Sequence, residues 1–226
     1  QNFYDILKVG DLIYLQDSVS GKILDQLPEA EAAFVASNPS TGAILSYQGG
    51  FNFSKSNFDR VKQSFPQAGS SFKPFIYSAA LEKGITAATL VNDAPIYITA
   101  KELNTNENWE PQNYNEKYDG AIRLRQGLAK SKNLVAIRVL KHIDPKYALD
   151  YITRFGFDKK KHPPYLSMAL GVGQVTALEM VAAYGVFANG GYLKQPYFIE
   201  KIIDVKGRKI KQSFSVTNEE TPRIID

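Results

Sequence analysis

The sequence predicts an α+β fold in which a long helical block separates two β-rich parts of the chain. Two apolar runs at residues 32–37 and 43–48 flank Asn38-Pro39-Ser40-Thr41-Gly42, a group of turn-forming residues typical of a hairpin. Helical periodicity then dominates residues 72–189, and strand-like segments return at 198–205 and 209–214, joined by a turn at 206–208. We therefore expect a sheet with a large helical subdomain inserted between its parts.

The first residues predict a small β unit before the main domain. Residues 9–15 and 22–27 read as short strands around a turn at 17–21. Two or three strands do not make a stable unit by themselves. We expect residues 1–27 to be the tail of a preceding small β (OB-like) or linker domain, and residues 28–226 to be the N-terminal and central part of the main domain.

Five helices are predicted in the central block. The first has apolar residues at helical spacing from Phe72 to Ala80 and ends at Gly84. The others are expected at residues 122–129, 134–142, 146–155 and 177–189, and Gly190-Gly191 stops the last of them.

Composition excludes several classes of function. The 226 residues contain no cysteine and two histidines, so neither a disulfide framework nor a thiolate metal site can form. A net charge of +4, with Lys159-Lys160-Lys161 as its one dense basic run, is too small and too local for a nucleic-acid interface. No apolar run is long enough to cross a bilayer. We expect no metal, no cofactor and no nucleic-acid partner.

The segment Gly69-Ser70-Ser71-Phe72-Lys73-Pro74 predicts a nucleophile. A serine and a lysine three residues apart on a helix project from one face. Pro74 has no N–H and is tolerated only near the first turn, so the helix should begin at about Ser70. The Ser70 hydroxyl then lies at the positive end of the helix dipole, and a desolvated Lys73 can act as its base. Ser-x-x-Lys also occurs by chance about once in a chain of this length.

A second polar group, Ser131-Lys132-Asn133, lies between two predicted helices. Ser131 or Asn133 could simply cap the helix that follows. Alternatively, the Ser131 hydroxyl relays a proton between the lysine and a leaving group, and the Asn133 amide binds the substrate backbone.

With these residues in place, the sequence resembles the transpeptidase domain of class A penicillin-binding proteins, especially Gram-negative members, over about residues 28–213. Ser-x-x-Lys and a Ser-x-Asn triplet are the first two of three motifs known for penicillin-binding proteins and class A β-lactamases. Four further phrases support the resemblance: Asn38-Pro39 through Gly42 to Gly49-Gly50, Trp109-x-Pro111-x-Asn113, the run from Ile122 to Leu128, and Phe187-Ala188-Asn189-Gly190-Gly191.

The resemblance implies a serine β-lactamase-like fold and a peptidoglycan D,D-transpeptidase. Ser70 would be acylated by the D-Ala-D-Ala end of a stem peptide or by a β-lactam, Lys73 and Ser131 would move protons, and Asn133 would hold the acyl donor. Trp109 and Asn113 fall on a segment that runs near the cleft in such proteins, although a lone tryptophan more often packs in a core. The protein would work on the periplasmic side of the inner membrane, anchored by a segment outside this chain.

One departure from the family pattern concerns the third motif. No Lys-Thr-Gly or Lys-Ser-Gly occurs up to Asp226. We expect the fold to be truncated before this motif, and this fragment alone to be inactive. Two alternatives stay open: a β-lactamase or D,D-carboxypeptidase that passes the acyl group to water, and a penicillin-sensing module that acylates without turnover.

Overall fold

The computed structural model describes residues 5–103, 106–212 and 223–226. In chain order its elements are β1 (Tyr14–Ser18), β2 (Gly21–Asp25), β3 (Phe34–Ser37), β4 (Ile44–Gln48), η2 (Gly69–Phe72), α1 (Lys73–Glu82), β5 (Leu90–Asp93), α2 (Ala100–Leu103), β6 (Gly120–Arg123), α3 (Leu124–Ala129), α4 (Asn133–Ile143), α5 (Pro145–Ile152), η3 (Thr153–Phe155), η4 (Lys159–Lys161), η5 (Leu166–Leu170), α6 (Ala177–Ala188), β7 (Lys201–Ile203) and β8 (Lys209–Gln212). The mixture of helices and strands confirms the α+β class.

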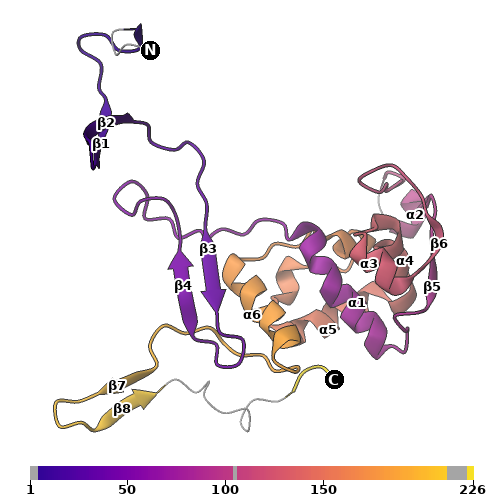
Figure 1. Ribbon diagram of the computed structural model, residues 1–226. Coiled ribbons are helices and arrows are strands. Elements are labelled where there is room, and N and C mark those ends of the chain that lie inside the picture. Colours follow the sequence, from indigo (N-terminus) through magenta and orange to yellow (C-terminus); the bar gives the residue numbers. More distant parts are fainter. Residues whose placement is uncertain (1–4, 104–105, 213–222) are drawn as a thin grey trace.

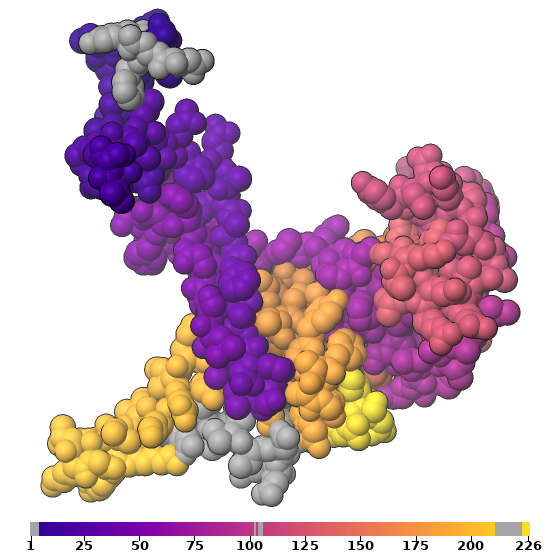
Figure 2. All heavy atoms as spheres, viewed as in Figure 1, coloured from indigo at the N-terminus to yellow at the C-terminus, as the bar shows by residue number. Residues whose placement is uncertain are grey.

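The helices form one body, and the hairpins lie around it (Figure 1). Helix α6 packs against β3, whereas the β1–β2 hairpin stands apart from the helices. In the space-filling view the N-terminal part and the β7–β8 hairpin project from the body (Figure 2). No helix in the described part of the chain has the length and apolar character needed to span a membrane.

The core lies where α1 and α4 pack together, with α5 and η5 against them. Helix α1 contributes Phe75 and Ile76, and α4 contributes Ile137 and Leu140, all of them fully buried. Burying one such side chain stabilises the fold by about 1.5–3 kcal/mol. The helix that carries Lys73 is therefore held rigidly in the centre of the molecule.

The strands pair differently from the single sheet that the sequence predicts. Each of the four sheets in the described residues is a two-stranded antiparallel hairpin or pair: β1–β2, β3–β4, β5–β6 and β7–β8. The β3–β4 hairpin pairs with the later part of the chain through a parallel bridge between Ala43 and Tyr197, in which the Ile44 N–H donates to the Tyr197 oxygen over 2.9 Å. In the described residues, the strands before and after the helices are thus linked by a single bridge and not by a continuous ladder.

Two elements differ from the prediction: one strand starts later in the chain, and the start of one predicted helix is a strand. The first strand begins at Tyr14 instead of residue 9, because Asp17 pairs with Lys22 across a turn of only two residues. Residues 122–123 are strand, not helix, because Ile122 pairs with Val91 of β5, an element that periodicity does not reveal. The Arg123 N–H donates to Gln126 Oε1, which starts α3 one residue later.

The other helix boundaries agree with prediction to within a few residues. The helical turn at the nucleophile starts at Gly69, Pro74 occupies the first turn of α1, and Gly84 ends that helix with φ +88°. Helix α6 ends one residue before Asn189, ahead of Gly190 and Gly191, which both have positive φ. The strand predicted at 209–214 is confirmed as β8 up to Gln212, and its last two residues lie outside the described part of the chain.

Candidate active site

Ser70 lies in the 3₁₀ turn η2, directly before α1, and its side chain is exposed. A 3₁₀ turn has three residues, so the side chains at i and i+3 eclipse one another. Ser70 and Lys73 therefore project from the same side of the turn. No hydrogen bond joins the Ser70 hydroxyl to another described residue, whereas the hydroxyl of neighbouring Ser71 donates to the Ala68 oxygen over 2.5 Å. Of the two adjacent serines, Ser70 is the one whose hydroxyl is available.

The segment after η5 holds this turn in place. The Gly69 N–H donates to the Gly171 oxygen over 2.9 Å, and Gln67 bridges to Gln174. A Cβ on Gly171 would lie 2.0 Å from the Gly69 oxygen, and its φ is +71°. Glycine is therefore required at 171 for the two backbones to approach so closely.

Lys73 is completely buried, and its ammonium group has three hydrogen-bond acceptors. It donates to the Ser131 carbonyl over 2.7 Å, to the Ser131 hydroxyl over 3.0 Å and to Asn133 Oδ1 over 2.8 Å. Desolvation by burial lowers the pKa of Lys73 to about 8. The neutral fraction near neutral pH is therefore much larger than that of an ordinary lysine, which makes this amine suited to act as a base.

Ser131 occupies a special position at the end of α3. The N–H of Lys132 donates to the Gly127 oxygen and that of Ser131 to the Leu128 oxygen, which together form a Schellman motif. In this motif the residue after the helix adopts the left-handed conformation, and Ser131 has φ +52°. Glycine is usual there, so Ser131 carries backbone strain while its exposed side chain faces Lys73.

Asn133 does not cap α4, because it is the first residue of the helix and Lys132 precedes it without a side-chain cap. Its Oδ1 accepts from Lys73, and its Nδ2 donates to the Gln112 carbonyl over 2.9 Å. The helix-cap alternative for Ser131 and Asn133 is therefore wrong in this structure. Binding of substrate by the Asn133 amide stays a prediction.

Asn113, predicted to bind substrate, is buried and its side-chain amide is fully used within the protein. Its Oδ1 accepts from the N–H groups of Asn133 and Leu134 over 2.9 and 3.3 Å, which caps α4 from a distant loop. Its Nδ2 donates to Asp93 Oδ1 and to the Lys117 carbonyl. These contacts assign Asn113 to holding the site together and argue against its contact with substrate.

Trp109 packs against the core and forms a bridge with Ile98. One side of it lines a pocket of about 600 Å³ together with Tyr165 and Leu166. The structure thus supports the packing alternative for this residue, and a substrate contact stays a prediction.

Comparison with known proteins decides the family. Residues 32–225 match the penicillin binding protein transpeptidase domain. The chain belongs to this family. Penicillin-binding protein 1A of Pseudomonas aeruginosa is 45% identical over 210 residues, which are 92% of this chain and 25% of the relative. Penicillin-binding protein 1A of Neisseria lactamica is 43% identical over 223 residues, or 98% of this chain and 28% of the relative.

Solved structures of penicillin-binding proteins share the fold. Penicillin-binding protein 1A from Haemophilus influenzae superposes with a TM-score of 0.83 at 42% identity, covering 91% of this chain and 30% of that one. PonA1 from Mycobacterium tuberculosis, in complex with penicillin V, has a TM-score of 0.71 at 24% identity and covers 87% and 54%. At that identity the likeness shows the fold alone. The chain spans about a quarter of the length of the curated relatives it matches.

Two charged residues of this transpeptidase domain escape sequence reasoning. Lys132 fills the variable position of the Ser-x-Asn motif and is buried in an ion pair with Asp93, itself completely buried. Asp93 lies on β5, a strand that periodicity does not reveal. In the sequence, Lys132 is marked only by its place between the serine and the asparagine of the motif. That place does not indicate that its side chain is buried.

Proposed function

We propose that this chain supplies the serine-acylating part of a peptidoglycan D,D-transpeptidase. Ser70 would be the nucleophile for stem-peptide D-Ala-D-Ala and for β-lactams. The observation that carries the proposal is the buried Lys73 amine, with its lowered pKa, bonded to both Ser131 and Asn133 one turn after an exposed serine. The names of its relatives, penicillin-binding protein 1A, support the choice of substrate.

The hydrogen bonds of Lys73 suggest how protons move. In the ammonium form all three N–H bonds are used. The Ser131 carbonyl and Asn133 Oδ1 can only accept, so they keep two N–H bonds of the neutral amine and leave its lone pair toward the Ser131 hydroxyl. The contact with the Ser131 hydroxyl is the one that can reverse direction. We propose that neutral Lys73 takes a proton from Ser70, one helical turn away, and that Ser131 passes one onward.

In the proposed acylation, the Ser70 oxygen bonds to the carbonyl carbon of the penultimate D-Ala as its proton passes to neutral Lys73. The C–N bond to the terminal D-Ala then breaks. The leaving amine receives the proton from Lys73 through the Ser131 hydroxyl, and an ester on Ser70 remains. The amine of a second stem peptide then bonds to the ester carbonyl carbon, the ester C–O bond breaks, and the proton lost by the amine returns to the Ser70 oxygen, which forms the crosslink and restores Ser70. With a β-lactam, the same attack opens the ring and the ring nitrogen takes the proton.

The rest of the proposal concerns the whole protein. We place the reaction on the periplasmic side of the inner membrane, where peptidoglycan is the substrate, in line with the relatives from Pseudomonas and Neisseria. We also expect the 226 residues alone to acylate poorly, because they contain no Lys-Thr-Gly or Lys-Ser-Gly. Experiments on acylation therefore use the full-length protein, with the 226-residue piece as a second sample.

The proposal is tested by treating the full-length protein with a penicillin and mapping the adduct by mass spectrometry. We expect one penicillin per protein on Ser70, no label in Ser70→Ala, and normal labelling in Ser71→Ala, the matched control whose hydroxyl is tied to Ala68. Label on Ser71 or Ser131 would contradict the assignment.

The lifetime of the adduct separates the alternatives. A transpeptidase or a sensor keeps the acyl group, while a β-lactamase releases it within its turnover time. Crosslinking of stem peptides then distinguishes the transpeptidase from the sensor.

A further inference from the structure

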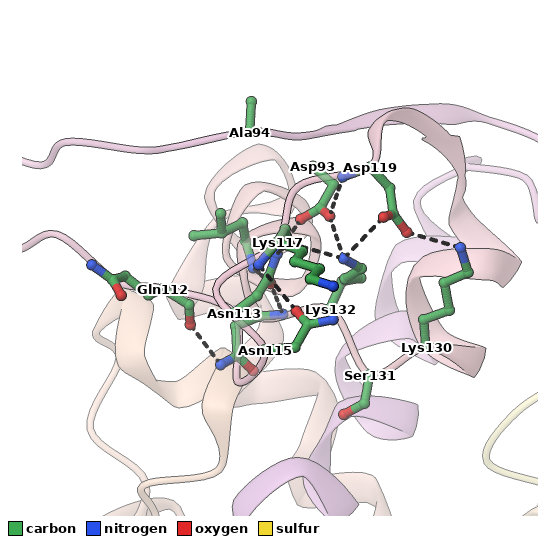
Figure 3. Close-up of polar contacts among 12 residues, drawn as sticks. Asp93, Ala94, Gln112, Asn113, Asn115, Lys117, Asp119, Lys130, Ser131 and Lys132 are labelled. Carbon is green, nitrogen blue, oxygen red and sulfur yellow. Dashed lines mark hydrogen bonds and ion pairs between the residues drawn. The ribbon is translucent and has the colours of Figure 1, made fainter.

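A buried ion pair lies directly behind the Ser131 turn. Lys132 Nζ is 2.8 Å from Asp93 Oδ2, and the two side chains are 5% and 0% exposed. Asp119 lies 3.4 Å from the same ammonium, and the Lys117 carbonyl accepts from it over 3.1 Å. Figure 3 shows the Asp93 and Asp119 carboxylates converging on Lys132, while the Ser131 side chain points away from them.

The Asp93 carboxylate also reaches the start of α4. Its Oδ1 accepts from Asn113 Nδ2 over 2.7 Å, and the Asn113 oxygen caps the N–H groups of Asn133 and Leu134. Its Oδ2 accepts from the Asp119 N–H over 2.9 Å. The Asp93 carboxylate therefore holds Lys132 through the ion pair. It also holds Asn133, through the cap that Asn113 provides.

The network satisfies the charge on Asp93 almost completely. Burial by itself would raise the pKa of this carboxyl, but hydrogen bonds from Asn113, Lys132 and the Asp119 N–H, with the charge of Lys132, lower it overall. Arg138 of α4 binds the Ala94 and Pro95 carbonyls that follow Asp93, which fixes β5 to the same helix. The carboxylate is thus ionised at neutral pH.

Stability alone does not account for this arrangement. A buried ion pair contributes little net stability, and apolar side chains of similar size are often as good or better. The pair lies next to Ser131, whose left-handed backbone is strained and must be held by its surroundings. Among the described residues, Ser131 and Asn133 supply every acceptor of the Lys73 ammonium, so a small displacement of this turn would alter the proposed base.

We propose that Asp93 is a positioning residue for acylation: through Lys132 and Asn113 it holds Ser131 and Asn133 in register with Lys73. This inference rests on the proposed function. A misplacement of about 1 Å in an active site can reduce the rate about a hundredfold. Loss of the pair should therefore slow the acylation step while leaving the non-covalent binding of penicillin nearly unchanged.

The test measures how a fluorescent penicillin acylates the full-length protein and its variants. The kinetics give a binding constant and an acylation rate constant for each variant, and its melting temperature is measured as well. Asp93→Asn leaves Lys132 buried with Asp119 alone and should lose both stability and rate. In the double variant Asp93→Asn/Lys132→Met, removal of both charges should restore the melting temperature. Its acylation rate constant should stay about 10- to 100-fold below wild type, with the binding constant within about threefold. Asp119→Asn, the matched control on the more exposed carboxylate, should acylate within about threefold of wild type.

Each result is decisive. If the wild-type protein does not label at Ser70, the proposed function fails. If it labels and the folded double variant acylates at the wild-type rate, the pair is merely structural and the inference about Asp93 is overturned. Should the double variant not fold, Asp93→Glu decides, because it keeps the charge and shifts the carboxylate. Slow acylation by that variant supports the positioning role, and wild-type acylation refutes it.

Discussion

The Lys73 amine is surrounded by neutral acceptors and has no carboxylate among its hydrogen-bond partners in the described chain. This distinguishes it from Lys132, whose pKa is raised, chiefly by its hydrogen bond with Asp93. The pKa values of these two buried lysines thus shift in opposite directions, because Lys132 has a carboxylate partner and Lys73 does not. The amide of Asn133 keeps the environment of Lys73 uncharged.

Asn133→Asp tests this point. A carboxylate 2.8 Å from the Lys73 nitrogen would favour the ammonium form and raise the pKa above its present value of about 8. Acylation near neutral pH should fall about 10- to 100-fold, and the alkaline rise of the pH–rate profile should move to higher pH by about one unit or more. The measurement is the acylation rate constant from pH 6 to 10. A slower enzyme with an unshifted profile would mean that Asn133 acts on the substrate and not on Lys73.

Helices α1 and α3 end in the same motif with different residues at its left-handed position. Gly84 takes this position after α1, where the Ile85 N–H donates to the Ala80 oxygen and the Gly84 N–H to the Leu81 oxygen. Ser131 takes it after α3. Only glycine adopts this conformation without a steric penalty. Ser131 therefore lowers the stability of the protein at the end of α3, and in return places a hydroxyl beside Lys73.

This difference predicts a reversal in stability. Ser131→Ala and Ser131→Gly both lose the hydroxyl bond to Lys73 and should acylate at least about a hundredfold more slowly. The glycine variant, however, should be the more stable of the two by about 1 kcal/mol, opposite to the usual order. Gly84→Ala is the control: its Cβ would meet no atom within 4 Å, so backbone strain alone should cost about 1 kcal/mol. Denaturant unfolding measures all three, and an alanine variant at 131 as stable as the glycine variant would remove the argument for strain.

An aromatic cluster around Phe72 joins the nucleophile turn to distant parts of the chain. Phe72 of η2 stacks on His162 at 5.0 Å and contacts Phe75 and Phe157. His162 is buried, and neither of its ring nitrogens has a partner among the described residues. Burial, and to a smaller extent the charge of Lys161, lower the pKa of His162, against the opposing effect of Glu179 and Asp158. The imidazole is therefore neutral in the folded protein at neutral pH.

An acid-dependent loss of stability follows. The unfolded chain binds a proton at His162 with the ordinary pKa of about 6.5, whereas the folded protein does so only at lower pH. Stability should therefore fall as the pH drops below about 6.5, by up to about 1.4 kcal/mol per pH unit, until the folded-state pKa is passed. His162→Phe, which keeps a ring against Phe72, should abolish this dependence, whatever its absolute stability. His142→Gln changes the exposed histidine and should retain it. Equal pH dependence in wild type and His162→Phe would show that other groups are responsible.

Local spacing is sufficient to predict the nucleophile turn. Ser70 and Lys73 lie on one helical turn, Pro74 restricts where that turn can begin, and Gly84 ends the helix, all through contacts between near neighbours in the chain. The α+β class and most helix boundaries follow from the same short-range periodicity. The resemblance in motifs then identifies the family without any coordinates.

Tertiary structure decides the rest because the deciding contacts join residues far apart in the chain. Lys73 and Ser131 are 58 positions apart, and the cap that Asn113 provides for Asn133 spans 20. No periodicity indicates that β5 exists, that Ile122 pairs with it, or that Asp93 and Lys132 are buried together. Burial and partner choice depend on how separate elements pack, and packing is a property of the folded chain. That is why Asn133 could be assigned as a cap from its position, when in space Asn113 caps α4 and Asn133 faces the lysine.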